Sequence, residues 1–381
     1  MRRFLFWFSL LVLGWTYAVF PATLLARARF RPRPHATADI TPPVSVVIAA
    51  HNEEASIGVK LENLLATDYP AECRQVIVAS DGSTDGTDDE VRRFADRGVD
   101  LVTPGRVGKA AALDAAAAAA TGDILVFTDA NSMFAAGALR QLVAPFADPE
   151  VGGVAGNQVY RDADVGPAAG EGERRYWDFD RALKKAESLA GNAISATGAI
   201  YAIRRSLFRG VPVGVTDDFA VSTDVIAQGK RLVFAPGAVA YEPVAADDRR
   251  EYRRKVRIIT RGLRGVLLRR ELLDPGRTGF YAAQLLTHKL LRRLMFVPLG
   301  LLALGSVGAF RDGWIYRLAA IGQAAFYGAG AAALLAPRSA LGRLKPSRLA
   351  GFFILVNLAA AEAALNVVRG RRIERWQPDR E

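Results

Sequence analysis

The 381-residue chain has a single cysteine, Cys73, and only three histidines. One cysteine excludes an internal disulfide framework and any metal site built from several thiolates. The histidines, His35, His51 and His288, do not follow the spacing of a metal site. The loop before Lys109 lacks the upstream glycine of a Walker motif, which argues against a P-loop ATPase.

Acidic residues are outnumbered: 39 Asp and Glu stand against 50 Lys and Arg, and the formal net charge is +11. Many basic residues lie directly beside apolar segments instead of being spread evenly. These residues are Arg27, Arg29, Arg31, Arg33, Arg338, Arg343, Lys345 and Arg348. Basic residues in such positions are typical of the cytosolic flanks of membrane helices. We therefore expect membrane lipids as partners, and no nucleic acid.

Hydrophobic residues make up 51% of the sequence, and residues 4–26 form an uncharged apolar run. This run is long enough for a helix across about 30 Å of hydrocarbon. A cleaved signal peptide is the alternative, because Arg2 and Arg3 precede the run, but the core of a signal peptide is usually only about 7–15 residues. We predict a membrane helix over residues 1–26 and a basic linker over 27–41 that places the next domain in the cytosol.

Three further apolar segments within residues 294–368 predict a multi-pass protein of the cell membrane. The segments are residues 294–310, 315–336 and 349–368. Before them, residues 249–293 mix leucine with arginine, which predicts amphipathic helices along the cytosolic membrane surface. One span before the domain and three after it would place the basic tail, residues 369–381, outside the cell, against the positive-inside rule. Either a carboxyl-terminal segment is re-entrant or the rule fails here; both remain open.

Residues 42–248 alternate β-rich runs with helical stretches, which is typical of an α/β domain. The expected strands are residues 44–50, 75–80, 99–103 and 123–129. The expected helices between them are residues 54–66, 85–95 and 109–120. The strands show no polar alternation, which indicates burial on both faces. We predict an α/β fold with a mainly parallel sheet and helices on both faces, together with α-helical transmembrane segments.

Polar side chains follow three of these strands. Asn52 and Glu53 follow the first strand, Asp81 the second, and Asp129 and Asn131 a later one. Helix capping explains any single loop, because Asp, Asn and Ser are preferred N-cap residues. Ligands of open α/β sheets bind beyond the carboxyl ends of the strands, so three such loops at one edge favour a binding site.

Further motifs indicate an anionic ligand. Gly108 and Lys109 start a helix, where backbone N–H groups and a lysine suit phosphate. A nucleotide diphosphate beside acidic loops calls for a hard bridging cation, Mg²⁺ or Mn²⁺, which prefers oxygen ligands. Asp217 and Asp218 open a later helix, and they either cap it or supply a general base for sugar transfer. Gly198 lies in a segment whose backbone can approach a ligand closely.

From about residue 42 to residue 302, the chain resembles the family 2 inverting glycosyltransferases, in the branch of the bacterial cellulose, chitin-oligosaccharide, hyaluronan and poly-N-acetylglucosamine synthases. The resemblance rests on five motifs taken together, and it implies a GT-A-like fold. The motifs are Asn52-Glu53, Asp81 within Ser-Asp-Gly-Ser-Thr-Asp-Gly-Thr, Gly108-Lys109, Asp129-Ala130-Asn131 and Thr216-Asp217-Asp218.

The resemblance also implies a role for each motif. The implied nucleotide-sugar-binding residues are Asn52, Glu53, Asp81, Lys109, Asp129 and Arg257. The implied metal ligands are Asp129 and Asn131. Asp218 is the implied catalytic base, with Asp217 beside it, and Gly198 belongs to the acceptor side.

Two departures from the family pattern matter. Asn131 replaces the second aspartate of the metal motif, so a neutral carbonyl would supply that ligand. The family's Gln-x-x-Arg-Trp element is reduced to Arg254-Lys255-Val256-Arg257-Ile258. Arg257 can still stabilise a departing diphosphate, although a membrane-surface helix explains the same arginines equally well. The missing tryptophan leaves open whether transfer is processive.

We therefore expect a glycosyltransferase that moves a sugar from a nucleotide-diphosphate sugar, in the first place a UDP-sugar, to a glycan or lipid-linked acceptor at the cytosolic face. Exopolysaccharide or cell-envelope glycan synthesis is the expected setting. The membrane segments either form an export channel, which would need a homo-oligomer or an export partner, or hold the catalytic face against a lipid acceptor. A catalytically weak membrane scaffold that binds nucleotide sugars is the alternative.

Overall fold

The computed structural model describes residues 1–160, 171–242 and 248–371, and its contacts divide the chain into two compact units. One unit, here called the helical unit, combines Met1–Thr23, Asp247–Val266 and Gln284–Ile373. The other, here called the sheet unit, contains Leu24–Ala246 and Leu267–Ala283. Each unit is therefore assembled from segments that are far apart in the sequence.

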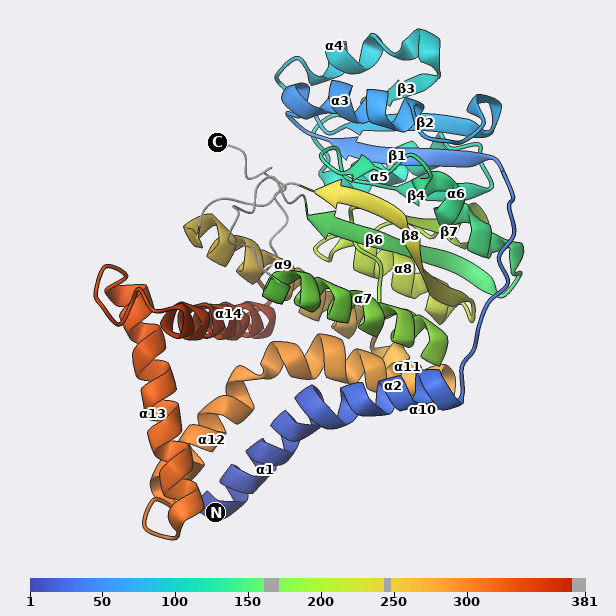
Figure 1. The fold of residues 1–381 in the computed structure, drawn as a ribbon. Helices are drawn as coiled ribbons and strands as arrows, with labels where there is room; N and C mark the ends of the chain where they lie inside the picture. Colours follow the sequence, from blue (N-terminus) through green and yellow to red (C-terminus); the bar gives the residue numbers. More distant parts are fainter. Residues whose placement is uncertain (161–170, 243–247, 372–381) are drawn as a thin grey trace. The chain divides into compact units, whose positions relative to one another are not determined.

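The sheet unit contains an eight-stranded sheet in the order β3-β2-β1-β4-β7-β6-β8-β5 (Figure 1). The strands are β1 (Val44–Ala50), β2 (Arg74–Ser80), β3 (Val99–Val102), β4 (Ile124–Phe127), β5 (Met133–Phe134), β6 (Val151–Tyr160), β7 (Tyr201–Arg204) and β8 (Arg231–Glu242). The strands β1 to β4 are parallel to one another, whereas β7 runs antiparallel to both β4 and β6. The sheet is therefore mixed, with its parallel half formed by the first four strands.

Helices cover both faces of this sheet, as predicted, and the central strands are buried accordingly. Every residue of β1 is buried. Alternate β1 side chains, such as Val46 and Ile48, join one core cluster with residues of α3 (Glu54–Leu65), α4 (Thr87–Arg92) and α6 (Ala138–Val143), because successive side chains of a strand point to opposite faces. The helices α5 (Lys109–Ala118) and α8 (Asp217–Ala227) lie outside that cluster; α5 packs on β1 and β2, and α8 on β6 and β8. The helix α7 (Glu171–Ala190) packs against β8.

The helical unit contains the apolar helices. The first, Arg2–Phe30, consists of α1 (Arg2–Gly14), a π-helical turn (Trp15–Val19) and α2 (Phe20–Phe30), and its residues from Leu24 onward belong to the sheet unit. The others are α12 (Phe296–Gly308), α13 (Trp314–Leu335), α14 (Lys345–Val368) and the arginine-rich α9 (Asp248–Leu268). The short helices α10 (Pro275–Thr278) and α11 (Phe280–Leu285) follow α9 in the sequence and belong, up to Ala283, to the sheet unit.

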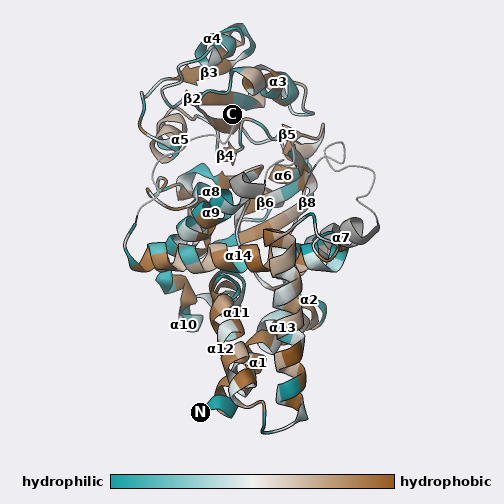
Figure 2. Ribbon diagram, turned by 90° about the vertical axis from the view of Figure 1, so that its left-hand side faces the viewer, coloured by the Kyte–Doolittle hydropathy of each residue, from teal (hydrophilic) through white to brown (hydrophobic). Residues whose placement is uncertain are grey.

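Within the described residues, three helices are long and apolar enough to cross a membrane: Arg2–Phe30, Trp314–Leu335 and Lys345–Val368. A fourth span arises if Phe280–Leu294 and Phe296–Gly308, which are bent by 58° at their junction, are counted as one. Figure 2 shows the apolar residues along α1, α12 and α13. These helices overlap the four apolar segments that the sequence predicts.

Candidate active site

The polar loops after β1, β2 and β4 meet at one edge of the sheet. The strands end in register: Ala50 pairs with Ser80, and Val47 with Phe127. The Asp81 N–H donates to the Ala50 carbonyl at 2.8 Å, which continues the pairing one residue into the loops. Because parallel strands share their carboxyl edge, chain order alone brings these loops together.

Asn52 and Glu53 tie the first loop to the second. The Asn52 side-chain oxygen accepts a hydrogen bond from the Thr84 N–H at 2.8 Å, and the Glu53 N–H donates to the Thr87 hydroxyl at 2.8 Å. Asn52 adopts a φ of 53°, in the left-handed region that asparagine tolerates better than most residues. Both residues therefore brace the two loops against each other, and their predicted contact with a nucleotide sugar stays a prediction.

Asp81 holds the loop that carries Lys109. Its side chain is fully buried, and one carboxylate oxygen accepts the N–H groups of Val107 and Gly108 at 2.7 and 2.6 Å. The other oxygen pairs with the Arg106 guanidinium at 2.6 Å. Gly82 permits this packing, because its φ is 62° and a Cβ there would lie 2.9 Å from the Arg106 Cβ. A nucleotide that contacts the Asp81 carboxylate therefore has to compete with this loop.

Lys109 joins two predicted site acids that lie far apart in the sequence. Its Nζ lies 2.8 Å from Oδ1 of Asp129 and 3.2 Å from Oδ2 of Asp217. Burial lowers the pKa of the Lys109 ammonium, but the carboxylates of Asp129 and Asp217 outweigh burial and hold that pKa above its usual range. The lysine therefore stays charged and neutralises the centre of the site.

Asp217 and Asp218 form the first turn of α8, where the positive end of the helix dipole favours carboxylates. The two side chains differ in their partners. Asp217 pairs with Lys109, whereas Asp218 Oδ1 accepts the Phe219 N–H at 2.7 Å. Asp218 thus lies beside Asp217 at the start of α8, and its predicted role as the base stays a prediction.

Gly198 lies directly against Asp129. A Cβ at residue 198 would lie 2.7 Å from the Asp129 Oδ2 atom, so only glycine fits without moving that carboxylate. The neighbouring Thr128 hydroxyl donates to the Ala199 carbonyl at 2.7 Å and fixes the same approach. The structure therefore places Gly198 beside the predicted metal ligand, and its role on the acceptor side remains a prediction.

The acids fit an incomplete metal site. In the described ranges, no three His, Cys, Asp or Glu side chains form a group that could hold a metal ion. The Lys109 ammonium nevertheless lies between Asp129 and Asp217, which shows that a positive charge is accommodated there. Asp129 and Asn131 could therefore hold a Mg²⁺ or Mn²⁺ ion whose remaining ligands are substrate phosphates and waters, the usual arrangement for Mg²⁺.

Lys60 lies behind the metal motif, and sequence reasoning missed it. This fully buried lysine of α3 donates to the Thr128 hydroxyl at 3.0 Å and to the Ser132 carbonyl, so it spans the loop that contains Asp129. Burial lowers the pKa of Lys60 to about 7, against the opposing effect of the Asp129 and Glu242 carboxylates. The sequence does contain a signal for this burial: Lys60 is spaced three residues after Ile57 and four before Leu64, so it lies on the apolar face of the helix.

Two hydroxyls beside the acids lack a hydrogen-bond partner, and sequence reasoning also missed these. The Tyr201 hydroxyl and the Thr197 hydroxyl are buried without one. Burial raises the pKa of Tyr201 well above its ordinary value, and the nearby carboxylates of Asp217, Asp218 and Asp129 raise it further. Buried polar groups usually have a partner, so these two hydroxyls are candidates for contact with a ligand.

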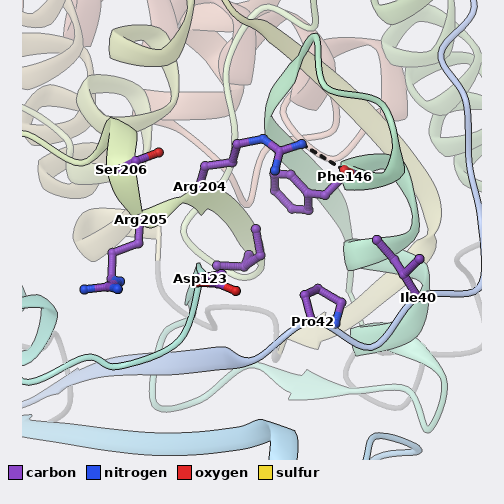
Figure 3. Close-up of a pocket in the computed structure, with 8 residues that line it drawn as sticks. Ile40, Pro42, Asp123, Phe146, Arg204, Arg205 and Ser206 are labelled. Atoms are coloured by element: carbon purple, nitrogen blue, oxygen red, sulfur yellow. Dashed lines mark hydrogen bonds between the residues drawn. The ribbon is translucent and has the colours of Figure 1, made fainter.

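A hollow of about 540 Å³ lies at the opposite edge of the sheet (Figure 3). It is lined by residues at the amino-terminal end of β4, including Asp123, and by the segment that leaves β7, including Arg205. Arg204 points toward Phe146 and donates to its carbonyl at 2.8 Å. This hollow contains none of the predicted site residues.

Arg257 lies on α9, in the helical unit. Its predicted contact with the diphosphate of the donor joins residues of two different units and remains a prediction.

A mixed sheet with this cluster of acids and cations at its carboxyl edge defines a glycosyltransferase of the GT-A type. Residues 45–211 match the family model of Glycosyl transferase family 2. Two relatives are a poly-beta-1,6-N-acetyl-D-glucosamine synthase of Staphylococcus aureus (strain COL) and an N-acetylglucosaminyltransferase of Rhizobium meliloti (strain 1021). The synthase is 26% identical over 72% of this chain and 67% of its own length; the transferase is 28% identical over 52% of this chain and 50% of its own length.

Two solved structures are also similar to this chain. Mannosyltransferase PcManGT from Pyrobaculum calidifontis, in complex with GDP-Man and Mn²⁺, is 27% identical with a TM-score of 0.71, over 97% of this chain and 100% of the other. Staphylococcus aureus TarS 1–349 in complex with UDP-GlcNAc, at 14% identity and a TM-score of 0.50 over 88% of this chain and 94% of the other, shows the shared fold. Residues 45–211 thus match a family 2 glycosyltransferase domain, and the chain is an enzyme of the hexosyltransferase type.

Proposed function

We propose that this protein is a membrane-anchored, inverting glycosyltransferase that moves a hexosyl group from a nucleoside-diphosphate sugar to a hydroxyl of a lipid-linked acceptor at the cytosolic face. The observation that carries the proposal is the Lys109 bridge, which gathers Asp129 and Asp217 at the edge where Asp81 holds the same loop. This bridge supports a shared position for the donor and the cation, with Asp218 next to Asp217 as the proposed base.

GDP-mannose is the donor that we favour. The structural neighbour with GDP-Man matches nearly the whole of both chains, including the apolar helices. The UDP-sugar expected from the sequence is the second candidate, because the curated relatives carry N-acetylglucosamine names, although they match a smaller part of this chain. Both donors present the same diphosphate, so the roles below hold for either.

In the reaction, the acceptor hydroxyl oxygen attacks the anomeric carbon while the bond from that carbon to the diphosphate oxygen breaks. Asp218 takes the proton of the hydroxyl, as a positioned general base. The departing nucleoside diphosphate gains negative charge, which Lys109 and Arg257 would stabilise. Attack from the face opposite the leaving group inverts the anomeric configuration.

Asp129 and Asn131 would hold a divalent cation together with the diphosphate oxygens. When bound, this cation neutralises phosphate charge and orients the leaving group. Lys109, which lies 2.8 Å from Asp129, would then be available to the diphosphate. Because the protein supplies an incomplete set of ligands, the cation and the nucleotide should bind cooperatively.

The membrane part of the proposal rests on the apolar helices and their basic flanks. Helix Arg2–Phe30 precedes a linker with Arg31 and Arg33, which favours an outside amino terminus and a cytosolic sheet unit. A lipid-linked acceptor suits an enzyme that is held at the bilayer. It also needs no export channel.

An activity assay of the purified full-length protein tests the proposal. GDP-mannose and UDP-N-acetylglucosamine are the donors, and a membrane lipid extract is the source of the acceptor. We expect nucleoside diphosphate release and a radiolabelled, lipid-extractable product. Asp218→Asn should bind nucleotide normally while turnover falls by about 10²- to 10⁴-fold, the usual contribution of a general base; Asp96→Asn, at an exposed position, is the matched control. Nucleotide binding without release from any donor would support the scaffold alternative instead.

A further inference from the structure

The helix α14 has the length and composition of a membrane span, and it packs against α13. Figures 1 and 2 both show it crossing the direction of α13. Both helices belong to the helical unit. The contacts of α14 therefore decide whether it crosses the membrane.

The other apolar helices define two ends of a bundle. Arg2 pairs with Asp312 at 3.1 Å, so the amino terminus lies beside the loop between α12 and α13. Farther along, the Trp15 indole donates to the Thr287 hydroxyl at 3.2 Å. The first helix and the segment leading into α12 are thus antiparallel neighbours, and α13 starts at the amino-terminal end and finishes at the other end.

At that other end, α14 packs on the last turns of α13. The rings of Phe326 and Phe353 are 5.4 Å apart. A Cβ at Gly330 would lie 2.5 Å from the Ile354 side chain, so a glycine allows this close crossing. A returning span would instead continue along the earlier turns of α13.

The later turns of α14 lie against α9. Lys255 lies 5.2 Å from the centre of the Phe352 ring, and the Tyr252 hydroxyl donates to Glu362 at 2.7 Å. The Arg264 guanidinium donates to the Arg371 carbonyl, just beyond the end of α14, at 2.9 Å. These contacts follow α14 from its second turn to its end.

The charge of α9 excludes it from hydrocarbon. The basic residues of its described side chains are Arg253, Arg254, Lys255, Arg257, Arg261 and Arg264. Each Arg or Lys at the centre of a membrane helix costs about 2.5–3.5 kcal/mol even on the most lenient scale. If α14 crossed the bilayer, α9 would have to separate from α14 or enter the bilayer together with α14. Contact along the helix is therefore compatible only with a shared position at the surface.

The buried face of α14 changes sides along its length. Near its start, Ser347, Ala350 and Gly351 are buried; later, the buried residues are Ala359, Ala360, Ala363 and Asn366. At 3.6 residues per turn, these sets lie on nearly opposite sides of the helix. The side opposite the later set exposes Leu358 and Leu365, which are 56% and 44% accessible, and between them Glu362, which accepts the hydrogen bond from Tyr252 of α9.

We propose that α14 lies beside α9 in the cytosolic surface of the bilayer, with Arg343, Lys345 and Arg348 at anionic lipid headgroups. The chain then crosses the membrane three times, and its carboxyl terminus is cytosolic. The proposal rests on the membrane anchoring proposed above. It removes the conflict between the basic tail and the positive-inside rule, because an odd number of crossings from an outside amino terminus ends inside.

Cysteine labelling of whole cells tests this topology. In full-length protein with Cys73→Ser, single cysteines are introduced as Arg311→Cys, Arg338→Cys or Arg369→Cys and are exposed to a membrane-impermeant maleimide before and after permeabilisation. We expect residue 311 to react in intact cells, and residues 338 and 369 only after permeabilisation. Labelling of residue 369 in intact cells, together with residue 311, would show that α14 spans and would overturn the proposal. Failure of residue 311 to react would instead overturn the membrane orientation on which it rests.

Depth measurements in anionic-lipid nanodiscs test the surface position directly. Spin labels at Leu349→Cys, Leu358→Cys and Leu365→Cys, all exposed positions, report depth through oxygen and nickel-chelate accessibility. In a spanning helix, residue 358 would lie about 14 Å deeper than residue 349, because nine residues rise about 1.5 Å each. We expect depths that agree within a few ångströms and that remain shallow. A deep minimum at residue 358 would refute the proposal.

Discussion

The replacement of Lys109 by methionine separates two roles that this side chain has in the site. Its ammonium lies between Asp129 and Asp217, at 2.8 and 3.2 Å, where it neutralises carboxylates that a divalent cation would use. An entering cation has to displace it. We therefore expect Lys109→Met to bind Mn²⁺ more tightly than the wild type in the absence of nucleotide, and yet to turn over more slowly.

The size of the effect follows from the two ion pairs. The side chains of Lys109, Asp129 and Asp217 are 20%, 33% and 20% exposed, so water screens both pairs partly. Partly solvated pairs of this kind contribute at most about 1 kcal/mol each. Their loss should tighten Mn²⁺ binding by roughly 5- to 30-fold, the factor that corresponds to one to two kcal/mol. Turnover should fall at saturating metal and donor, because the departing diphosphate loses a cation.

Electron paramagnetic resonance of free Mn²⁺ measures the first effect on full-length protein without substrate. Lys109→Arg keeps the charge and should bind Mn²⁺ close to the wild type. Lys230→Met removes a lysine that contacts the Pro149 carbonyl and is the matched control for methionine. Unchanged or weaker Mn²⁺ binding by Lys109→Met would refute the idea that the lysine occupies a cation position.

Three further variants test the surroundings of the site. Gly198→Ala should displace the Asp129 carboxylate and lower kcat/KM by about 100-fold, the effect of a misplacement of about 1 Å. Gly137→Ala, at a position with nothing within 4 Å of the new Cβ, should leave kcat/KM unchanged. Equal effects of the two variants would contradict the crowding of Gly198 against Asp129. Tyr201→Phe removes the buried hydroxyl that has no hydrogen-bond partner and should raise the donor or acceptor KM by roughly 5- to 10-fold, equivalent to about 1 kcal/mol for one hydrogen bond, without loss of thermal stability; unchanged kinetics would exclude contact with substrate. Lys60 has a pKa of about 7 in the folded protein against an ordinary 10.5, so the unfolded chain binds more protons than the folded protein between these two pH values. From pH 7 to pH 9, the free energy of unfolding of the wild type should therefore rise by about 2 kcal/mol relative to that of Lys60→Met. Parallel pH profiles of thermal unfolding for the two proteins would contradict this.

Much of the site could be predicted because parallel strands place their following loops at one edge. The strand predicted over residues 44–50 is β1, and the predicted helix start at Lys109 is the start of α5. Buried strands without polar alternation and a Gly-Lys helix start are local signals. They require no knowledge of which segments pack together.

Pairings between distant segments could not be predicted in this way. Asp217 and Asp218 are neighbours in the sequence, and only packing of α8 beside the carboxyl edge shows that Asp217 is the partner of Lys109. Lys60 reads as one polar residue in an amphipathic helix until β4 and the loop after it enclose it. Tyr201 has no local signal at all, because its missing partner is a property of its surroundings.

The sequence by itself determined the α/β alternation, the apolar segments and the chemical character of the site, since each depends on residue type and on spacing over a few turns or strands. The tertiary structure decided which charges meet, which polar groups are buried, and in which direction α14 runs. Hydropathy records how apolar a helix is, whereas its direction depends on the helices that it packs against, and for α14 those are the last turns of α13 and the charged helix α9.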